Sequence, residues 1–215
     1  MSKKSEYNET SGDSSRIEPK PASLVTAPPS APSVSRRKLL QAGLVTGFAT
    51  PLVAIAQPAS RMRPQTGDWL VFDGGDLSGQ RITPELLTLE QRPVSALAKD
   101  PVTATIRNGS RLNRVMVTKL DSARLSETSL PHTAGGVIAF SAVCTHTGCD
   151  VVNWDDGELL MACPCHESKF DVYNGADVVG GPAPRPLALL PLALDGDRLV
   201  VASTFRGRVG FTQQF

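Results

Sequence analysis

The sequence predicts an all-β fold for the larger part of its 215 residues, from about residue 67 onward. Short apolar segments recur along this part of the chain, and Asn-Gly or Asp-Gly pairs stand between several of them. Such pairs favour the tight turns that join antiparallel strands. Many short strands at this spacing indicate a sandwich of antiparallel strands.

Length and composition bound the alternatives. The length suggests one domain with appendages, and a hydrophobic content of 40% is enough for one modest core. A net charge of +1 and an aromatic content of 5% give neither the basic surface nor the stacking platform of a nucleic-acid-binding protein. We therefore expect no nucleic-acid partner.

The chain begins with a polar leader. Residues 1–35 are rich in Ser, Pro, Lys and Glu, a composition that buries little and predicts disorder. Arg36 and Arg37 then precede an apolar stretch, residues 39–56. Paired arginines before such a stretch resemble a twin-arginine export signal, which carries proteins that are already folded. We expect export to the periplasmic side, where a disulfide can persist.

Two fates of the predicted apolar helix within residues 36–56 stay open. As a helix, residues 39–56 reach about 27 Å, just enough to span a bilayer and anchor the chain in the inner membrane. The small residues of Ala54-Ile55-Ala56 also fit a cleavage site. Residues 57–66 read as a neck, and as a hinge if the helix is retained.

The strands are expected in the following order. Residues 102–107 and 115–120 flank Asn108-Gly109 and predict a hairpin with a loose loop, and residues 121–136 predict a polar loop with a brief helical turn. The other expected strands are residues 69–72, 137–140, 151–154, 158–162, 170–173, 178–179, 187–194 and 199–202. The tail, residues 203–215, either folds back on the domain or meets a partner.

Two short blocks hold all four cysteines and two of the three histidines. The first reads Cys144-Thr-His146-Thr-Gly-Cys149, and the second reads Cys163-Pro-Cys165-His166. A [2Fe-2S] centre with two Cys on one iron and two His on the other needs one Cys and one His from each of two loops. Cys144, His146, Cys163 and His166 supply that set.

The two cysteines outside this set predict a disulfide. Cys149 lies three residues after His146, and Cys165 lies directly before His166. Because two loops that bind one cluster would bring these cysteines together, we expect the Cys149–Cys165 bond to clamp the loops. Three other readings stay open: a zinc site, although its usual spacings are absent, a four-cysteine cluster, and two plain disulfides.

The two blocks resemble those of the Rieske [2Fe-2S] proteins of the disulfide-containing, high-potential branch. That branch includes the Rieske subunit of cytochrome bc complexes and the small subunit of arsenite oxidase. The resemblance covers roughly residues 135–202, and it implies a Rieske-type domain over residues 67–215 whose cluster-binding part is about 135–190. Gly181-Pro182-Ala183-Pro184 is similar to the family's proline loop. Ser168 matches a family serine whose hydroxyl donates a hydrogen bond to a bridging sulfide of the cluster.

Three positions depart from the pattern of bc complexes. Glu167 stands where Gly is usual, Thr147 where an apolar Leu is usual, and Phe170 where high-potential members carry a Tyr that donates to a cysteine ligand. A lost donor to sulfur and a nearby carboxylate both lower the reduction potential. We expect a potential within roughly −150 to +300 mV but below the top of that range.

The resemblance implies an exported one-electron carrier that is not catalytic alone. In one placement it is the subunit of a quinol:cytochrome c reductase, with quinol, cytochrome b and a c-type cytochrome as partners. In the other it serves the large subunit of a periplasmic molybdenum oxidoreductase. A Rieske oxygenase needs a further iron site, which the remaining His132 cannot supply. A structural metal-binding module without redox function is the remaining alternative.

Overall fold

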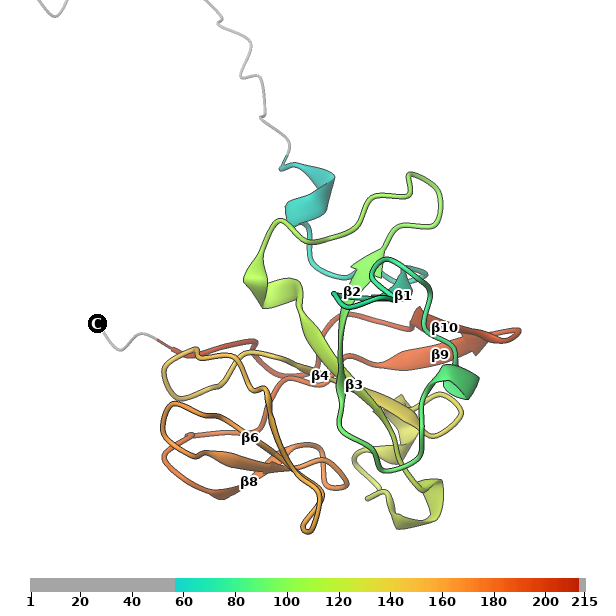
Figure 1. Ribbon diagram of the computed structural model, residues 1–215. Helices are drawn as coiled ribbons and strands as arrows, with labels where there is room; N and C mark the ends of the chain where they lie inside the picture. The colour runs from blue at the N-terminus through green and yellow to red at the C-terminus, as the bar shows by residue number, and fades with distance from the viewer. Residues whose placement is uncertain (1–56, 213–215) are drawn as a thin grey trace, which may run out of the picture. The chain divides into compact units, whose positions relative to one another are not determined.

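The computed structural model describes residues 57–212, and these contain ten strands, five short 3-10 turns and no α-helix (Figure 1). The predicted leader, the predicted signal or anchor and the last three residues lie outside this range. Among residues 57–212, no helix is both long and apolar enough to cross a bilayer. The all-β class is confirmed for the described part, and the N-terminal helix remains a prediction.

The larger of two antiparallel sheets has six strands in the order β4-β3-β2-β1-β10-β9. The strands are β1 (Trp69–Phe72), β2 (Val94–Lys99), β3 (Val115–Lys119), β4 (Val137–Ser141), β9 (Leu192–Asp195) and β10 (Arg198–Val201). Leu70 of β1, Val117 of β3 and Leu199 of β10 are fully buried in one core. This core belongs to the larger sheet and does not include the cysteines.

Strand β4 contributes to two cores. Val137 and Ala139 lie in the core of the larger sheet, whereas Ile138 and Phe140 lie in a second core that contains Cys144. Successive side chains of a strand point to opposite faces, so a strand buried on both faces reads as a continuous apolar run. This run carries the chain directly from the larger sheet to the cysteine-rich blocks.

The smaller sheet is inserted between β4 and β9, and Figure 1 shows its strands β6 and β8 apart from β9 and β10. Its order is β5 (Asn153–Asp155), β6 (Leu160–Ala162), β7 (Lys169–Asp171) and β8 (Asp177–Gly180). Backbone hydrogen bonds connect the two ends of this insertion. The amide of Ser141 donates to the carbonyl of Ala188 at 2.7 Å, and that of Leu190 donates to Ala139 at 2.9 Å.

The prediction of a strand at residues 102–107 is wrong. Asp100 Oδ1 accepts the amide of Val102 at 2.8 Å, which starts a tight loop, and Ala104 has a φ of 57° that no extended strand tolerates. The strand next to β1 is β2, eight residues earlier, which pairs with β3 through Ser95 and Met116. The predicted hairpin partner is therefore displaced along the chain.

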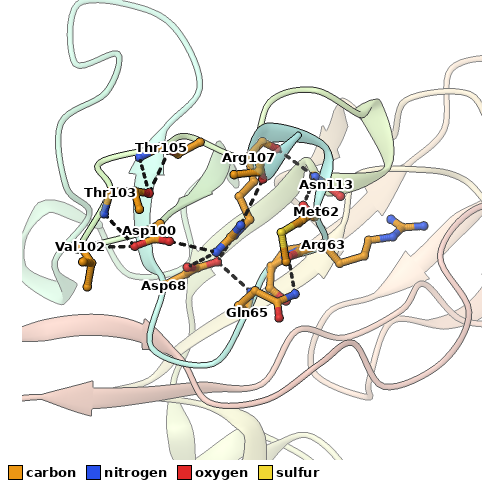
Figure 2. A network of polar contacts seen from close by, with 12 residues as sticks. Met62, Arg63, Gln65, Asp68, Asp100, Val102, Thr103, Thr105, Arg107 and Asn113 are labelled. Atoms are coloured by element: carbon orange, nitrogen blue, oxygen red, sulfur yellow. Dashed lines mark hydrogen bonds and ion pairs between the residues drawn. The ribbon is translucent and has the colours of Figure 1, made fainter. Parts of the chain in front are cut away.

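A buried ion pair lies beneath this loop (Figure 2). The Arg107 guanidinium donates to both carboxylate oxygens of Asp68, through Nε and, at 2.9 Å, through Nη2. Both side chains are less than 5% exposed, and Asp100 lies 3.7 Å from Arg107 as a second acidic neighbour. A charge this buried is stabilised only by its partners. The pair thus joins the start of β1 to the loop after β2.

The predicted neck is bound to the domain, and Figure 2 shows one of its contacts, between Met62 and Asn113. The carbonyl of Ala59 accepts from Arg107 Nη1 at 3.1 Å, and that of Met62 accepts from Asn113 Nδ2 at 2.7 Å. Arg63 donates to the carbonyl of Leu112 at 2.6 Å. These contacts argue against free hinge motion within residues 59–63.

Candidate metal centre

The first block forms a tight loop (the first loop, residues 144–149) after β4. The amide of Cys144 donates to the carbonyl of Cys149 at 2.8 Å, and the carbonyl of Cys144 accepts the amide of Gly148 at 3.1 Å. Gly148 has a φ of +83°, in the left-handed region that favours glycine. The loop therefore closes on its own backbone.

The second block (the second loop, residues 163–168) repeats the same hydrogen bonds. The amide of Cys163 donates to the carbonyl of Ser168 at 2.9 Å, and its carbonyl accepts the amide of Glu167 at 2.9 Å. Glu167, with a φ of +58°, occupies the place of Gly148 in the first loop. Because this position requires a positive φ, there is a physical reason why glycine is usual where this chain has Glu167.

A disulfide joins the two loops, as predicted. Cys149 and Cys165 are bonded, with their Cα atoms 6.5 Å apart. The bond brings the predicted imidazoles together: the ring centroids of His146 and His166 lie 4.6 Å apart, with the rings nearly perpendicular. His146 is half-buried and His166 is exposed.

The other two cysteines are buried free thiols. Cys144 is 1% exposed and Cys163 is 2% exposed. Burial raises the pKa of the Cys144 thiol, while the backbone amide of His146 and the hydroxyl of Ser168 act in the opposite direction. A thiolate at this place therefore needs a positive charge beside it, and a bound metal ion supplies one.

The donor set fits a [2Fe-2S] cluster. The Nδ1 atom of His146 is buried, yet it has no hydrogen-bond partner among residues 57–212, although buried polar atoms are normally paired. An iron ion would satisfy it. The sulfurs of Cys149, Cys163 and Cys165 also lie within 4.8 Å of one another, but two of them are already bonded to each other. The fit thus rests on two thiols and two imidazoles, as for a mixed Cys/His cluster.

The predicted proline loop (residues 181–184) and Arg185, which follows it, contact both loops. The amide of Ala183 donates to Ser168 Oγ at 3.1 Å, so the predicted site serine also positions this loop. The hydroxyl of Thr145 donates to the carbonyl of Arg185 at 2.7 Å. A hollow of about 540 Å³ beside the site is lined by Thr145, His146, Pro182, Pro184, Arg185 and Thr212.

The three departures from the family pattern differ in their surroundings. Phe170 is fully buried in the core that contains the free cysteines, whereas Thr147 and Glu167 are exposed. Arg185 lines the same hollow as His146, and the Phe211 ring packs on Gly148 of the first loop. Arg185 was not among the predicted site residues. Its only local signal is a charged residue between Pro184 and Pro186.

The remaining histidine lies outside the donor set. His132 ends the 3-10 turn Leu130–His132 and is half-buried. Burial and, to a lesser degree, the positive charge of Arg206 lower its pKa. His132 lines a different hollow from the one that His146 lines.

The sequence matches one protein family and several of its members. The sequence profile of the Rieske [2Fe-2S] domain matches residues 106–191. The "putative respiratory nitrate reductase subunit Rieske" of Haloferax mediterranei is 33% identical over 170 residues, which cover 77% of this chain and 72% of that relative. The cytochrome b6-f complex iron-sulfur subunit of a Synechococcus species is 34% identical over 181 residues, covering 79% and 87%. The solved plasma membrane Rieske protein PetC3 from Synechocystis PCC 6803 matches with a TM-score of 0.32 and 25% identity, over 51% of this chain and 84% of that one.

Proposed function

Because the chain belongs to the Rieske [2Fe-2S] protein family, we propose that it is the iron–sulfur subunit of a quinol:cytochrome c reductase-type complex. Family membership implies a Rieske-type [2Fe-2S] cluster and a place in electron transport. One observation carries the proposal: two buried thiols and two adjacent imidazoles converge on two loops that the Cys149–Cys165 bond joins.

Each predicted site residue has a distinct task. Cys144 and Cys163 would bind one iron, and His146 and His166 the other. When bound, the cluster supplies reversible one-electron transfer. The two thiols lie in the buried core, away from solvent, and the Ser168 hydroxyl connects the second loop to the proline loop. Hydrogen bonds of this kind tune the reduction potential.

The exposed imidazole of His166 is suited to meet a redox partner. A histidine that binds metal through one ring nitrogen keeps the other free as a donor or acceptor. On His166 this nitrogen can accept a proton from a quinol or lie close to a c-type haem. The domain would thus pass one electron from quinol to cytochrome c.

A second placement is favoured by one comparison. The relative from Haloferax mediterranei is named as a Rieske subunit of a respiratory nitrate reductase rather than of a bc complex. The exposed Glu167 beside the site also favours a lower potential than that of the bc subunits. In this placement the chain is the small subunit of a periplasmic molybdenum oxidoreductase. The two placements share the cluster and differ in the donor and the acceptor.

We also propose export by the twin-arginine route, with the domain on the periplasmic side. The support is the Arg36-Arg37 pair before the apolar residues 39–56, together with a disulfide that persists in an oxidising compartment. A retained helix would anchor the subunit in the inner membrane. A cleaved helix would release it.

One experiment separates the placements. Membrane and soluble fractions are prepared, the chain is purified from each with its attached proteins, and its N-terminus is sequenced. The proposal expects a chain that retains residues 36–56 in the membrane fraction and co-purifies with b-type and c-type haem. Cleavage after Ala56 and co-purification with a molybdenum protein would instead support the second placement. A chain that shows no reversible one-electron bleaching would contradict both.

A further inference from the structure

The C-terminal segment (residues 206–212) lies against the first loop. Its start pairs with the chain that follows the proline loop: the amide of Arg206 donates to the carbonyl of Leu189 at 2.7 Å, and the amide of Leu189 donates back at 3.0 Å. Further along, a Cβ added at Gly210 would lie 3.3 Å from Cγ1 of Val143. The segment thus follows the edge of the first loop.

Arg185 joins three parts of the site. Its carbonyl accepts from Thr145 of the first loop, and its guanidinium donates to the carbonyls of Arg208 and Gly210 in the C-terminal segment. Among residues 57–212, no carboxylate forms an ion pair with it. Its guanidinium instead bridges these two carbonyls, for which the planar fork of an arginine is suited.

The segment lies close to one of the two imidazoles, that of His146. The Phe211 ring packs on Gly148, where an added Cβ would lie 2.6 Å from Phe211 Cδ1. Thr212 and Arg185 line the hollow that also contains His146. His166 is exposed, whereas His146 is half-buried. The two imidazoles therefore differ in access.

We propose that Arg185 is a positioning residue that holds the C-terminal segment against the first loop and thereby limits access to the His146 imidazole. The inference rests on the proposed function for the identity of the imidazoles as ligands. The shielding itself depends only on contacts within the chain. It assigns a role to a tail whose function the sequence left open.

The test is residue-specific chemical labelling of the full, cluster-loaded chain. Diethyl pyrocarbonate acylates accessible imidazole nitrogens, and peptide mass spectrometry reports the ratio of labelling at His166 to labelling at His146. The wild-type chain is expected to label several-fold faster at His166. In Arg185→Gln the segment is released, so labelling at His146 rises and the ratio falls toward one, while the visible absorbance of the cluster persists as proof of a folded site.

Matched variants separate the contact from the charge. Arg185→Lys keeps the positive charge but cannot present the planar fork to two carbonyls, so it should behave like Arg185→Gln. Arg206→Gln removes an arginine side chain from the same segment but leaves its backbone pairing with Leu189, so the wild-type ratio should persist. Phe211→Ala should raise labelling at His146, and Arg185→Gln should add little to it.

Two results would overturn the proposal: equal labelling of both histidines in the wild-type chain, or a wild-type ratio in Arg185→Gln with the cluster spectrum intact. Sulfide content is measured in the same samples. A chain without sulfide would contradict the proposed function, and the labelling ratio of that chain would still test the shielding. The two failures are therefore distinguishable.

Discussion

Replacing Gly181 by alanine tests how the proline loop is placed over the site. A Cβ at Gly181 would lie 2.5 Å from the Cα of Ser168, 2.7 Å from its amide nitrogen and 2.8 Å from the carbonyl oxygen of Glu167. All three atoms belong to the backbone of the second loop, so no side-chain rotation relieves the overlap. Gly181→Ala must therefore push the proline loop away from the site.

The loss of stability expected for Gly181→Ala has two parts, one from the backbone conformation and one from the contact with the second loop. Gly181 has a φ of +78°, where a non-glycine residue costs about 1–2 kcal/mol, partly offset by about 0.4–1 kcal/mol from the unfolded chain. The overlap adds about 1–3 kcal/mol, and loss of the Ala183–Ser168 hydrogen bond adds about 0.5–1.5 kcal/mol. Only the overlap and the lost hydrogen bond report on the contact between the proline loop and the second loop.

Gly196→Ala is the matched control, because Gly196 has a φ of +66° in the turn between β9 and β10 and no atom lies within 4 Å of its added Cβ. Urea unfolding should show Gly181→Ala to be less stable than Gly196→Ala by about 2–4 kcal/mol. Decay of the visible absorbance in mild urea should be faster in Gly181→Ala alone. Equal losses of stability and equal decay in the two variants would refute the contact.

Three further changes test the clamp, the potential and the buried ion pair. Cys149→Ser should lower the free energy of unfolding by about 3 kcal/mol, because it opens a loop of 16 residues, and should shorten the cluster lifetime. Phe170→Tyr should raise the midpoint potential in a redox titration, because the new hydroxyl can donate to a ligand sulfur. Asp68→Asn should cost about 3–5 kcal/mol in urea unfolding, because the buried Arg107 loses its anionic partner.

Each change has an outcome that counts against its reason. If the cluster lifetime of Cys149→Ser equals that of the wild type, the disulfide does not clamp the loops. An unchanged or lower potential in Phe170→Tyr would mean that the ring lies away from the ligand sulfurs. For the ion pair, Asp195→Asn is the control, because its contact with Arg198 at 3.8 Å is exposed and is expected to contribute less than about 1 kcal/mol.

The local signals of the sequence predicted much of the fold. Strands β1 and β4 lie where apolar runs predicted them, because each run is bounded by turn residues and is buried by the elements next to it. The hairpin of β7 and β8 turns at Asn174 and Gly175, as expected from that pair. The disulfide was predictable because the spacing of Cys149 and Cys165 depends on two short loops alone.

Strand β2 could not be predicted because its conformation depends on its neighbours. It reads Val-Ser-Ala-Leu-Ala-Lys, and Ala, Ser and Lys have little preference for strands. Pairing with β1 and β3 on both sides decides its state. The β-branched residues of the segment 102–107 suggested a strand more strongly, but the turn at Asp100 and the inward ion pair of Arg107 prevent one.

The surroundings of the candidate site were less predictable than its donors. The partners of the Arg185 guanidinium lie 23 and 25 residues further along the chain, beyond the reach of any local pattern. The equivalence of Gly148 and Glu167 was hidden as well, because the two blocks space their Cys and His differently. It becomes visible only when both loops show the same backbone hydrogen bonds.

Iron and acid-labile sulfide measured together on one anaerobic preparation test the central claim most directly. With Cys144, Cys163, His146 and His166 as ligands, the chain should contain about two iron and two sulfide ions, and the reduced protein should give the paramagnetic signal of a mixed Cys/His cluster. Replacing His166 by alanine should abolish that signal. Zinc without sulfide in the wild-type chain would contradict the account.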